Sequence, residues 1–415
     1  MATVVLLGAL DTKGEEYAFI RDRVIDAGCD VVMINAGVLE DPEYPTEFGR
    51  EEVASEAGAD IEALVAAGDR GTAVTAMAEG AATISQRLCN EDRVHGLLGM
   101  GGSGSASIVS HAMQQLPIGF PKLLVSTMAA GNVSAYVGTS DIAMMYSVVD
   151  IAGINAVSSS ILGNAAAAVA AMAVAYEARV PSADSRPLVG ATMYGTTTQC
   201  VDTARDTLDR LGYELLVFHA TGTGGRSMEA LMRSGYITAS LDVTTTELID
   251  EVAGGTLSAG PDRLEAAGEL GLPQVVSIGA TDQITFTPPQ AVPPEYRDRT
   301  SYEHNPSITL VRSNAEECVE FGRMVAEKLN RARGPVSLFV PLRGSSSYAV
   351  SGGVFHDPIA DAALVESLRI HLDPSVELVE MDTDINDPAF AEAMARRLDE
   401  HYHTWVAGQA EEAGT

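Results

Sequence analysis

The segment that decides the fold reads Val94-His-Gly-Leu-Leu-Gly99-Met-Gly101-Gly102-Ser103-Gly104-Ser105. A short apolar run enters a glycine-rich turn, and apolar residues then recur at the spacing of a helix. Glycines at such a turn let backbone amides close on an anion, and the dipole of the following helix adds to the attraction. The segment therefore predicts a strand, a phosphate-binding loop and a helix, in that order.

The same alternation of strand and helix continues on both sides of this segment. Nearly all the apolar runs are continuous, which is typical of a parallel sheet covered by helices on both faces. In the first half the predicted strands are Val4–Gly8, Val31–Asn35, Val94–Leu98 and Leu123–Thr127, and the helices are Glu15–Ala27, Arg50–Ala67, Gly71–Cys89 and Ser105–Gln115. In the second half the predicted strands are Leu188–Met193, Glu214–Phe218, Ile237–Leu241, Gln274–Ile278, Val336–Phe339 and Val376–Met381, and the helices are Val201–Leu211, Ser227–Arg233, Asp262–Leu270, Ala315–Arg331, Pro358–His371 and Pro388–His403.

A length of 415 residues corresponds to two domains, or at most three. The polar Pro/Ser stretch Ala178–Pro187 is the expected boundary between them. We therefore predict an α/β fold with two Rossmann-like, doubly wound parallel-sheet domains that face each other across a cleft. The first, residues 1–180, carries the glycine-rich phosphate loop, and the second, residues 181–415, is expected to hold a co-substrate.

The charge balance limits the partners. Lys and Arg number 26 against 57 Asp and Glu, which gives a formal net charge of −31. This field repels phosphate backbones and anionic lipids, so neither a nucleic acid nor a membrane is the expected partner. The uncharged stretch Ile151–Tyr176 is rich in Ala, Ser, Asn and Gly, and it predicts a buried helix at a domain or subunit interface. We expect a cytoplasmic protein that forms a homodimer or a higher homo-oligomer.

Ligands of open α/β sheets bind beyond the carboxyl ends of the strands. In the first half of the chain, the candidates at these positions for nucleotide binding are Gly8, Asp11, Thr12, Lys13, Gly101, Gly102, Ser103, Gly104, Ser105, Thr127, Gly131 and Thr139. Asp11 and Asp141 are the candidates for holding Mg²⁺, directly or through water. The alternative for Asp11 and Thr12 is that they only cap a helix. The loop matches G-x-G-x-x-G, but no acidic residue follows about 20 residues later, which disfavours NAD.

The second half offers a further set of polar strand ends. The candidates for the co-substrate are Gly195, Thr196, His219, Thr221, Gly224, Gly225, Arg226, Thr245, Glu247 and Asp282. No catalytic residue is assigned, and the candidates for that role are Lys13, His219 and Glu247. The segment Tyr302-Glu303-His304-Asn305 lies in a predicted Pro-rich loop that is either a lid over the site or a surface excursion.

Several longer motifs resemble a known family when taken together. They are Gly8-x-x-Asp11-Thr12-Lys13, Gly101-Gly102-Ser103-Gly104, Leu116–Lys122, Tyr136–Asp141, Val149–Asn155, Val217–Arg226, Asp242–Glu247 and Glu303-His-Asn305. Their order resembles the Tm-1-like family of bacterial, archaeal, fungal and plant proteins, whose plant members include the N-terminal part of a tomato mosaic virus resistance protein. One departure falls near Thr383–Asp387, where Asp384 stands in place of the family's histidine.

The resemblance implies two Rossmann-like subdomains, ATP binding with a divalent cation, and self-association. It implies no settled reaction. The sequence leaves three functions open: an ATP-dependent enzyme that activates or phosphorylates a small metabolite, a nucleotide-binding regulatory or interaction module without turnover, and a binder of sugar phosphates or carboxylates.

Overall fold

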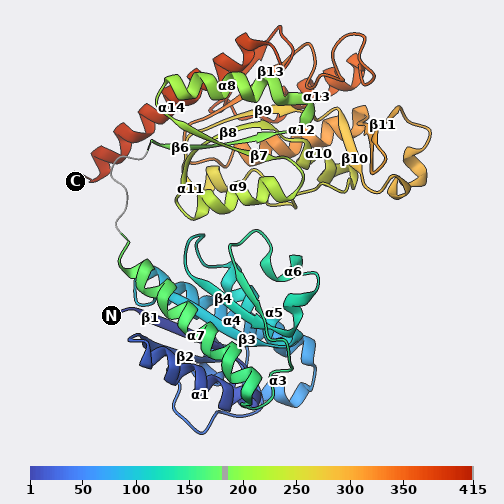
Figure 1. Cartoon of the computed structure of the whole chain (residues 1–415). Helices are drawn as coiled ribbons and strands as arrows, with labels where there is room; N and C mark the ends of the chain where they lie inside the picture. Colours follow the sequence, from blue (N-terminus) through green and yellow to red (C-terminus); the bar gives the residue numbers. More distant parts are fainter. Residues whose placement is uncertain (180–185, 414–415) are drawn as a thin grey trace. The chain divides into compact units, whose positions relative to one another are not determined.

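The computed structural model describes residues 1–179 and 186–413. The chain divides into two compact units, Met1–Ala183 and Asp184–Thr415, and each is described by itself (Figure 1). Much of the predicted boundary stretch, residues 180–185, lies outside the described residues.

The N-terminal domain is built on a parallel sheet of five strands in the order β2-β1-β3-β4-β5. The strands are β1 Thr3–Gly8, β2 Asp30–Asn35, β3 Gly96–Gly101, β4 Lys122–Ser126 and β5 Ala143–Tyr146. In this order the chain leaves β1 toward one side for β2 and toward the other side for β3, so the switch point of the sheet lies between β1 and β3. The predicted strands are all present, and β5 is an addition.

Helices cover both faces of this sheet. They are α1 Leu10–Asp26, α2 Arg50–Glu56, α3 Ile61–Ala67, α4 Arg70–Asn90, α5 Ser103–Gln114, α6 Ser134–Val137 and α7 Ala156–Glu177, with one 3-10 turn, η1 Thr127–Ala130. Because successive side chains of a strand point to opposite faces, Val4 and Leu6 join the core under α1 and α7, whereas Val5 and Leu7 join the core under α4 and α5. Figure 1 shows α1 and α7 side by side on their face.

The predicted helix Arg50–Ala67 is two helices, α2 and α3. Gly58 has a φ of +68°, which a helix interior does not allow. Asp60 then caps α3 by accepting a hydrogen bond from the Ala63 amide at 2.8 Å. The break turns α3 toward the start of α4, where it lines a cavity described below.

Helix α7 covers most of the uncharged stretch Ile151–Tyr176 expected to form a buried helix, but it begins at Ala156 and ends at Glu177. It is long and apolar enough, by length and composition, to cross a membrane. One side packs in the core of the N-terminal domain, through residues such as Leu162 and Val169. Its other side, which includes Val157 and Val174, is exposed.

The C-terminal domain is built on a parallel sheet of six strands in the order β14-β13-β9-β8-β6-β7. Its strands are β6 Leu188–Met193, β7 Glu214–His219, β8 Ile237–Thr244, β9 Gln274–Gly279, β13 Val336–Pro341 and β14 Glu377–Met381. The switch point lies between β6 and β8, so both domains share one topology. This agrees with the predicted α/β class of two doubly wound parallel-sheet domains, while the predicted cleft between them stays a prediction.

Helices α8 and α14 pack on one face of this sheet, and the others belong to the opposite face. The helices are α8 Thr198–Arg210, α9 Thr223–Arg233, α10 Thr246–Ala253, α11 Ala266–Leu270, α12 Ala315–Leu329, α13 Pro358–His371 and α14 Pro388–Ala413, with 3-10 turns η2 Gly195–Thr197, η3 Pro289–Ala291 and η4 Pro294–Tyr296. Helix α10 is missing from the prediction, and the predicted helix Asp262–Leu270 shortens to α11.

The predicted Pro-rich loop contains a small antiparallel sheet instead. Its strands are β10 Gln283–Phe286, β11 Ser301–Asn305 and β12 Ile308–Arg312, in the order β10-β12-β11. All five residues of β11 are exposed. The rings of Tyr302 and Tyr348 lie 5.1 Å apart, so this strand contacts the loop that follows β13.

Candidate functional sites

The turns after β1 and β3 meet at the carboxyl edge of the N-terminal sheet, at its switch point. Gly102 is the N-cap of α5, with extended backbone and no side-chain cap, so the first amides of this helix have no side chain bound to them there. Gly101 has a φ of +147°, and a Cβ at this residue would lie 2.4 Å from that of Ser105. The start of α5 therefore has no side-chain cap, while phosphate binding by this turn stays a prediction.

An arginine that the sequence did not indicate lies beside this loop. The guanidinium of Arg70, from the start of α4, is 2.9 Å from the position a Cβ would take on Gly104. Within the described residues, Arg70 is exposed and makes no ion pair and no side-chain hydrogen bond. A positive charge without a partner therefore stands next to the N-terminus of α5. Its signal in the sequence was weak, because Arg70 follows no strand.

Arg70 also lines a cavity of about 390 Å³ within the N-terminal domain. The first turn of α1 contributes Asp11, and α5 contributes Ser105. The remaining wall is largely apolar, with side chains from α3, α4 and the turn after β2: Leu39, Leu64, Val65, Val74 and Met77. The cavity wall is therefore mostly apolar, and its charged side chains are Asp11, Asp69 and Arg70.

Asp11 binds the turn after β2 with one oxygen only. Its Oδ2 accepts hydrogen bonds from the amides of Val38 and Leu39, each at 3.0 Å. Its Oδ1 is buried and has no hydrogen-bond partner. Asp11 is thus more than a helix cap, and it keeps a carboxylate oxygen that a cation could bind.

Lys13 and Gly8 have different surroundings from those expected. Lys13 lines a separate cavity of about 770 Å³, among carboxylates that include Glu15, Glu40 and Glu43. A Cβ on Gly8 would lie 1.9 Å from the hydroxyl of Tyr17, and that hydroxyl accepts a hydrogen bond from the Met100 amide. Gly8 therefore makes room for a side chain that ties β1 to β3.

Asp141 cannot share a metal ion with Asp11. Its carboxylate is 2.6 Å from the Nζ of Lys122 and accepts a hydrogen bond from the Gly119 amide at 2.7 Å. Lys122 begins β4, so Asp141 lies at the amino edge of the sheet, whereas Asp11 lies at the carboxyl edge. Thr139 belongs to the same returning segment and is separated from the glycine loop in the same way. Thr127 stays near the loop, because its Oγ1 is 3.9 Å from a Cβ placed on Gly102.

Hydrogen bonds join several turns at the carboxyl edge of the C-terminal sheet. Gln283 donates to Thr196 Oγ1 at 2.9 Å. The carbonyl oxygen of Thr196 accepts from the Asn386 side chain at 3.0 Å and from the Ser347 amide at 3.2 Å. The turns after β6, β9, β13 and β14 are therefore fixed to one another, and Thr196 holds them together.

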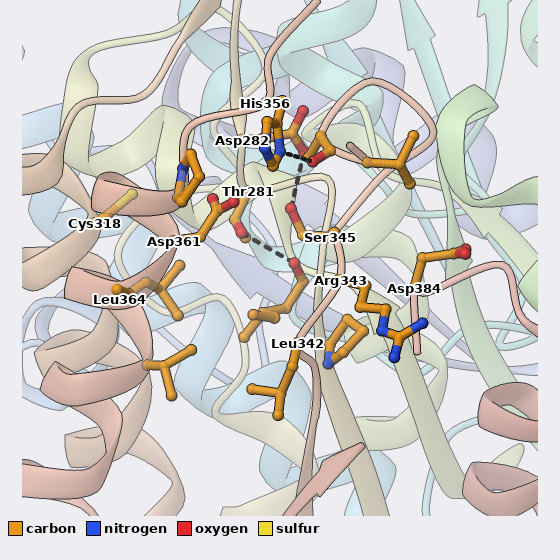
Figure 2. A pocket seen from close by; sticks show the side chains of 18 of the residues that line it. Thr281, Asp282, Cys318, Leu342, Arg343, Ser345, His356, Asp361, Leu364 and Asp384 are labelled. Atoms are coloured by element: carbon orange, nitrogen blue, oxygen red, sulfur yellow. Dashed lines mark hydrogen bonds between the residues drawn. The ribbon is translucent and has the colours of Figure 1, made fainter. Parts of the chain in front are cut away.

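A cavity of about 760 Å³ opens beside these turns, within the C-terminal domain. Asp282 is buried in its wall and accepts hydrogen bonds from Ser345 at 3.0 Å and Ser346 at 2.8 Å. Figure 2 shows Asp361 and Leu364 from α13 on one side of the cavity, and Arg343 and Asp384 on the other. Burial raises the pKa of Asp282, and it raises the pKa of Asp361 to about 6.

The other co-substrate candidates do not line this cavity. The turn that holds His219 and Arg226 follows β7, the outer strand, and the cavity lies beyond β9 and β13. Gly224 is required there for packing, because a Cβ on it would lie 1.9 Å from the His219 carbonyl oxygen. Thr221 only donates to that same carbonyl, and Gly195 faces open space.

Glu247 is fully buried and serves the fold. One carboxylate oxygen accepts hydrogen bonds from the amides of Gly222 and Gly225, and the other is 2.7 Å from the Nε of Arg263. A Cβ on Gly225 would lie 2.0 Å from this carboxylate, so glycine is needed there. Thr245 is also buried and donates to the Ser277 carbonyl. Neither Glu247 nor Thr245 can touch a ligand in this arrangement.

The loop Arg343–Ser351, which lines much of the cavity, is not among the site residues predicted from the sequence. It follows β13 and carries three consecutive serines, Ser345 to Ser347. Ligands of open α/β sheets bind after the carboxyl ends of strands, so the position of this loop after β13 is the sequence signal that could have indicated it. Asp384, where the sequence departs from the family pattern, also lines the cavity.

The two domains match one family over nearly the whole chain. Residues 2–178 match the N-terminal domain of the uncharacterised protein family UPF0261, and residues 186–402 match its C-terminal domain. The chain belongs to the UPF0261 family. A UPF0261 protein of Clostridium tetani is 47% identical over 397 residues, which cover 95% of this chain and 98% of the relative.

The tomato proteins expected from the motifs are relatives of this UPF0261 chain. The ToMV resistance protein Tm-1(GCR237) of Solanum lycopersicum is 40% identical over 333 residues, which cover 78% of this chain and 44% of the tomato protein. Among solved structures, the Spinosyn Rhamnosyltransferase SpnG aligns with 99% of this chain and 100% of its own at 12% identity, with a TM-score of 0.20.

Proposed function

We propose that this protein binds ATP with Mg²⁺ in its N-terminal domain. One observation carries the proposal: Arg70, a cation without a partner, stands between the uncapped start of α5 and a cavity with apolar walls. Phosphate groups bind at helix N-termini and to arginine, and a heterocyclic base suits an apolar cavity. A nucleotide needs both kinds of surroundings side by side.

The residues present also suit Mg²⁺. Asp11 keeps one buried oxygen without a hydrogen-bond partner at the same edge of the sheet. Mg²⁺ is commonly held by one or two carboxylates together with phosphate oxygens and water. No cluster of three or more His, Cys, Asp or Glu side chains that could hold a metal is present in residues 1–179 and 186–413, so the nucleotide itself would complete this site.

We further propose that the bound ATP activates or phosphorylates a small metabolite held by the C-terminal domain, in the cytoplasm. Closure of the predicted cleft would exclude water from the reaction. Lys13 and His219 stay candidates for the chemistry, since both are at carboxyl edges and neither is fully buried. The proposed homodimer would use the exposed face of α7.

The first test is calorimetric titration of ATP–Mg²⁺ into the wild type and Gly102→Asp. A Cβ on Gly102 has no atom nearer than 3.9 Å, and its φ is −78°, so the substitution fits. An N-cap aspartate occupies the α5 amides and repels phosphate, while it stabilises the helix. We expect affinity to fall roughly tenfold or more, because like charges in a partly desolvated site cost at least ~1.4 kcal/mol.

Gly102→Ala is the matched control, because it adds the Cβ without a charge or a hydrogen-bond acceptor. It should bind ATP–Mg²⁺ nearly as well as the wild type. Equal affinities of the wild type and Gly102→Asp would refute the proposed loop.

The rival function is a regulatory or interaction module that binds nucleotide without turnover. Incubation with ATP and a metabolite extract, followed by detection of ADP or AMP, separates the two. Product that requires the extract favours the enzyme, and its absence under every condition favours the module. A melting-temperature screen with sugar phosphates and carboxylates tests the third function.

A further inference from the structure

The C-terminal cavity has the position and size of a ligand site in its own right. It opens beyond the carboxyl ends of β9 and β13, where ligands of doubly wound sheets bind, and its volume of about 760 Å³ is within the range of small-molecule sites. The hydrogen bonds of Thr196 and Asp282 already fix its turns. The cavity is thus preformed, and the charged side chains of its wall indicate which kind of ligand it can bind.

Every arginine in its wall is already neutralised. Arg312 lies next to Asp361 and also donates to the Phe355 carbonyl at 2.8 Å. Arg343 forms two hydrogen bonds with Asp382, one of them at 2.7 Å. Arg369 forms two with Glu380, at 2.7 and 2.8 Å. Each guanidinium group of the wall therefore already has a carboxylate partner.

Carboxylate oxygens, in contrast, remain available. Asp361 has a half-buried side chain, and only its Oδ1 contacts Arg312. Its Oδ2 has no partner among the described residues. Asp384 uses Oδ1 to accept from the Asn386 amide, and its other oxygen is likewise unused within the described part of the chain. Asp361 is thus paired through one oxygen only, and Asp384 makes no ion pair within the described residues, so the charge in this wall that has no cationic partner is negative.

Apolar side chains form the rest of the wall. Leu342, Leu364 and Val350 line it together with Ile278. A ligand that fits these surroundings has a short aliphatic part and a positively charged end. An ammonium group supplies three hydrogen-bond donors, which match carboxylate and serine oxygens.

We infer that this cavity binds a small metabolite that carries a primary ammonium group on an aliphatic body, with Asp361 as the anchoring carboxylate. The inference places the second ligand at Asp282, Ser345 and Asp361, away from the turn of His219. It does not depend on ATP binding by the other domain, so each can fail without the other.

The test uses four-carbon probes that share one body and differ in charge: butylammonium, butanol and butanoate. Ligand-observed NMR on the full chain measures their binding at constant ionic strength. We expect saturable binding of butylammonium and much weaker binding of the other two. Asp361→Asn should weaken butylammonium roughly tenfold or more, because hydrogen bonds to charged groups contribute about 1.5–3 kcal/mol.

Two further variants keep the test sharp. Ala362→Phe fills the cavity from an exposed position of α13 and leaves all charges in place, so it should abolish binding even if Asp361→Asn folds poorly. Asp209→Asn is the matched control, since it also removes a carboxylate from an arginine ion pair, with Arg186, but at an exposed site outside the cavity. It should bind butylammonium as the wild type does.

Each alternative outcome overturns the inference. Equal binding of butylammonium by all four proteins would mean attraction to the acidic surface. Binding of butanoate that Ala362→Phe abolishes would show a ligand of the opposite charge in this cavity. Failure of all three probes to bind would exclude the site.

Discussion

The two domains share one sheet topology but use their charged side chains differently. In the N-terminal domain, Arg70 and Lys13 stand at the carboxyl edge without a partner in the described part of the chain. In the C-terminal domain, Arg263, Arg312 and Arg343 are held by carboxylates, whereas the exposed Arg226 in the first turn of α9 makes no ion pair within the described residues. A free cation attracts an anionic ligand, whereas a paired cation stabilises the fold, so the same architecture suits two classes of ligand.

The largest effect should come from Arg263, which is buried against Asp242, Glu229 and Glu247. Arg263→Met leaves these carboxylates without their cation, and we expect the C-terminal domain to lose about 3–5 kcal/mol of unfolding free energy. Denaturant-dependent hydrogen exchange measures this for each domain separately. Arg226→Met, an exposed arginine of the same domain, is the control and should change it by less than about 0.5 kcal/mol.

If Arg263→Met loses no more unfolding free energy than the control Arg226→Met, the contrast between paired and free cations is contradicted. The buried arginine would then not be needed to balance its carboxylates. Adding Asp242→Asn to Arg263→Met should recover part of the lost stability. It removes one of the negative charges that the arginine neutralised.

Acidity should stabilise the C-terminal domain in particular. Burial raises the pKa of Glu229 and Asp282, and it raises the pKa of Asp250 from 3.8 to about 7. A carboxyl whose pKa is raised by folding stabilises the protein below its unfolded pKa, and this contribution is lost as pH rises through the folded value. Between about pH 7.5 and pH 5 we expect a gain of roughly 1–3 kcal/mol.

The gain is measured by hydrogen exchange of the slowest amides in β8 and β9 as a function of pH. The slowest amides in β1 and β3 of the N-terminal domain serve as the comparison. Asp250→Asn should flatten the pH dependence of the first pair, because the residue no longer titrates. An equal pH dependence in both domains would point to the overall charge of −31 as the cause.

Removing the free cation of the N-terminal domain should affect binding and spare stability. We expect Arg70→Met to lower the affinity for ATP–Mg²⁺ about tenfold, the value of one charge-assisted contact, with the unfolding free energy unchanged within about 0.5 kcal/mol. Titration calorimetry and thermal unfolding measure the two quantities. Arg93→Met, exposed in the same domain, should leave both as they are.

The smallest effect is expected at Lys122, the buried cation of the N-terminal domain. Burial lowers the pKa of Lys122 against the opposing effect of Asp141. Lys122→Met replaces a buried ammonium with an apolar side chain of similar volume, and Asp141, half exposed, can take up water instead. Thermal unfolding should show a change within about 1 kcal/mol. Asp141→Ala should cost more, since it leaves the buried ammonium without its ion pair.

Much of the fold could be predicted from the sequence, because long apolar runs report burial on both sides of a sheet. The ten predicted strands are present, but the predicted glycine loop is shorter than expected, because β3 runs to Gly101, α5 begins at Ser103 and only Gly102 lies between them. The prediction failed where local pattern is weak: β5 is short and partly exposed, and the antiparallel strands β10 to β12 lie in a segment rich in proline. The break between α2 and α3 depends on one glycine and one capping aspartate.

The sites were harder to predict, because the spacing of residues in the sequence does not indicate which side chains are already in ion pairs or hydrogen bonds in the folded protein. Glu247, Asp141 and Asp11 are all polar residues near strands. Glu247, however, is ion-paired with Arg263, and Asp141 is ion-paired with Lys122. Arg70 lies far from the glycine loop in sequence and reaches it only because α4 packs against α5.

The sequence by itself determined the two parallel-sheet domains and the glycine turn, because burial and backbone geometry are encoded locally. Only the tertiary structure decided which charges are neutralised and which stay free. That outcome depends on contacts between residues far apart in the chain.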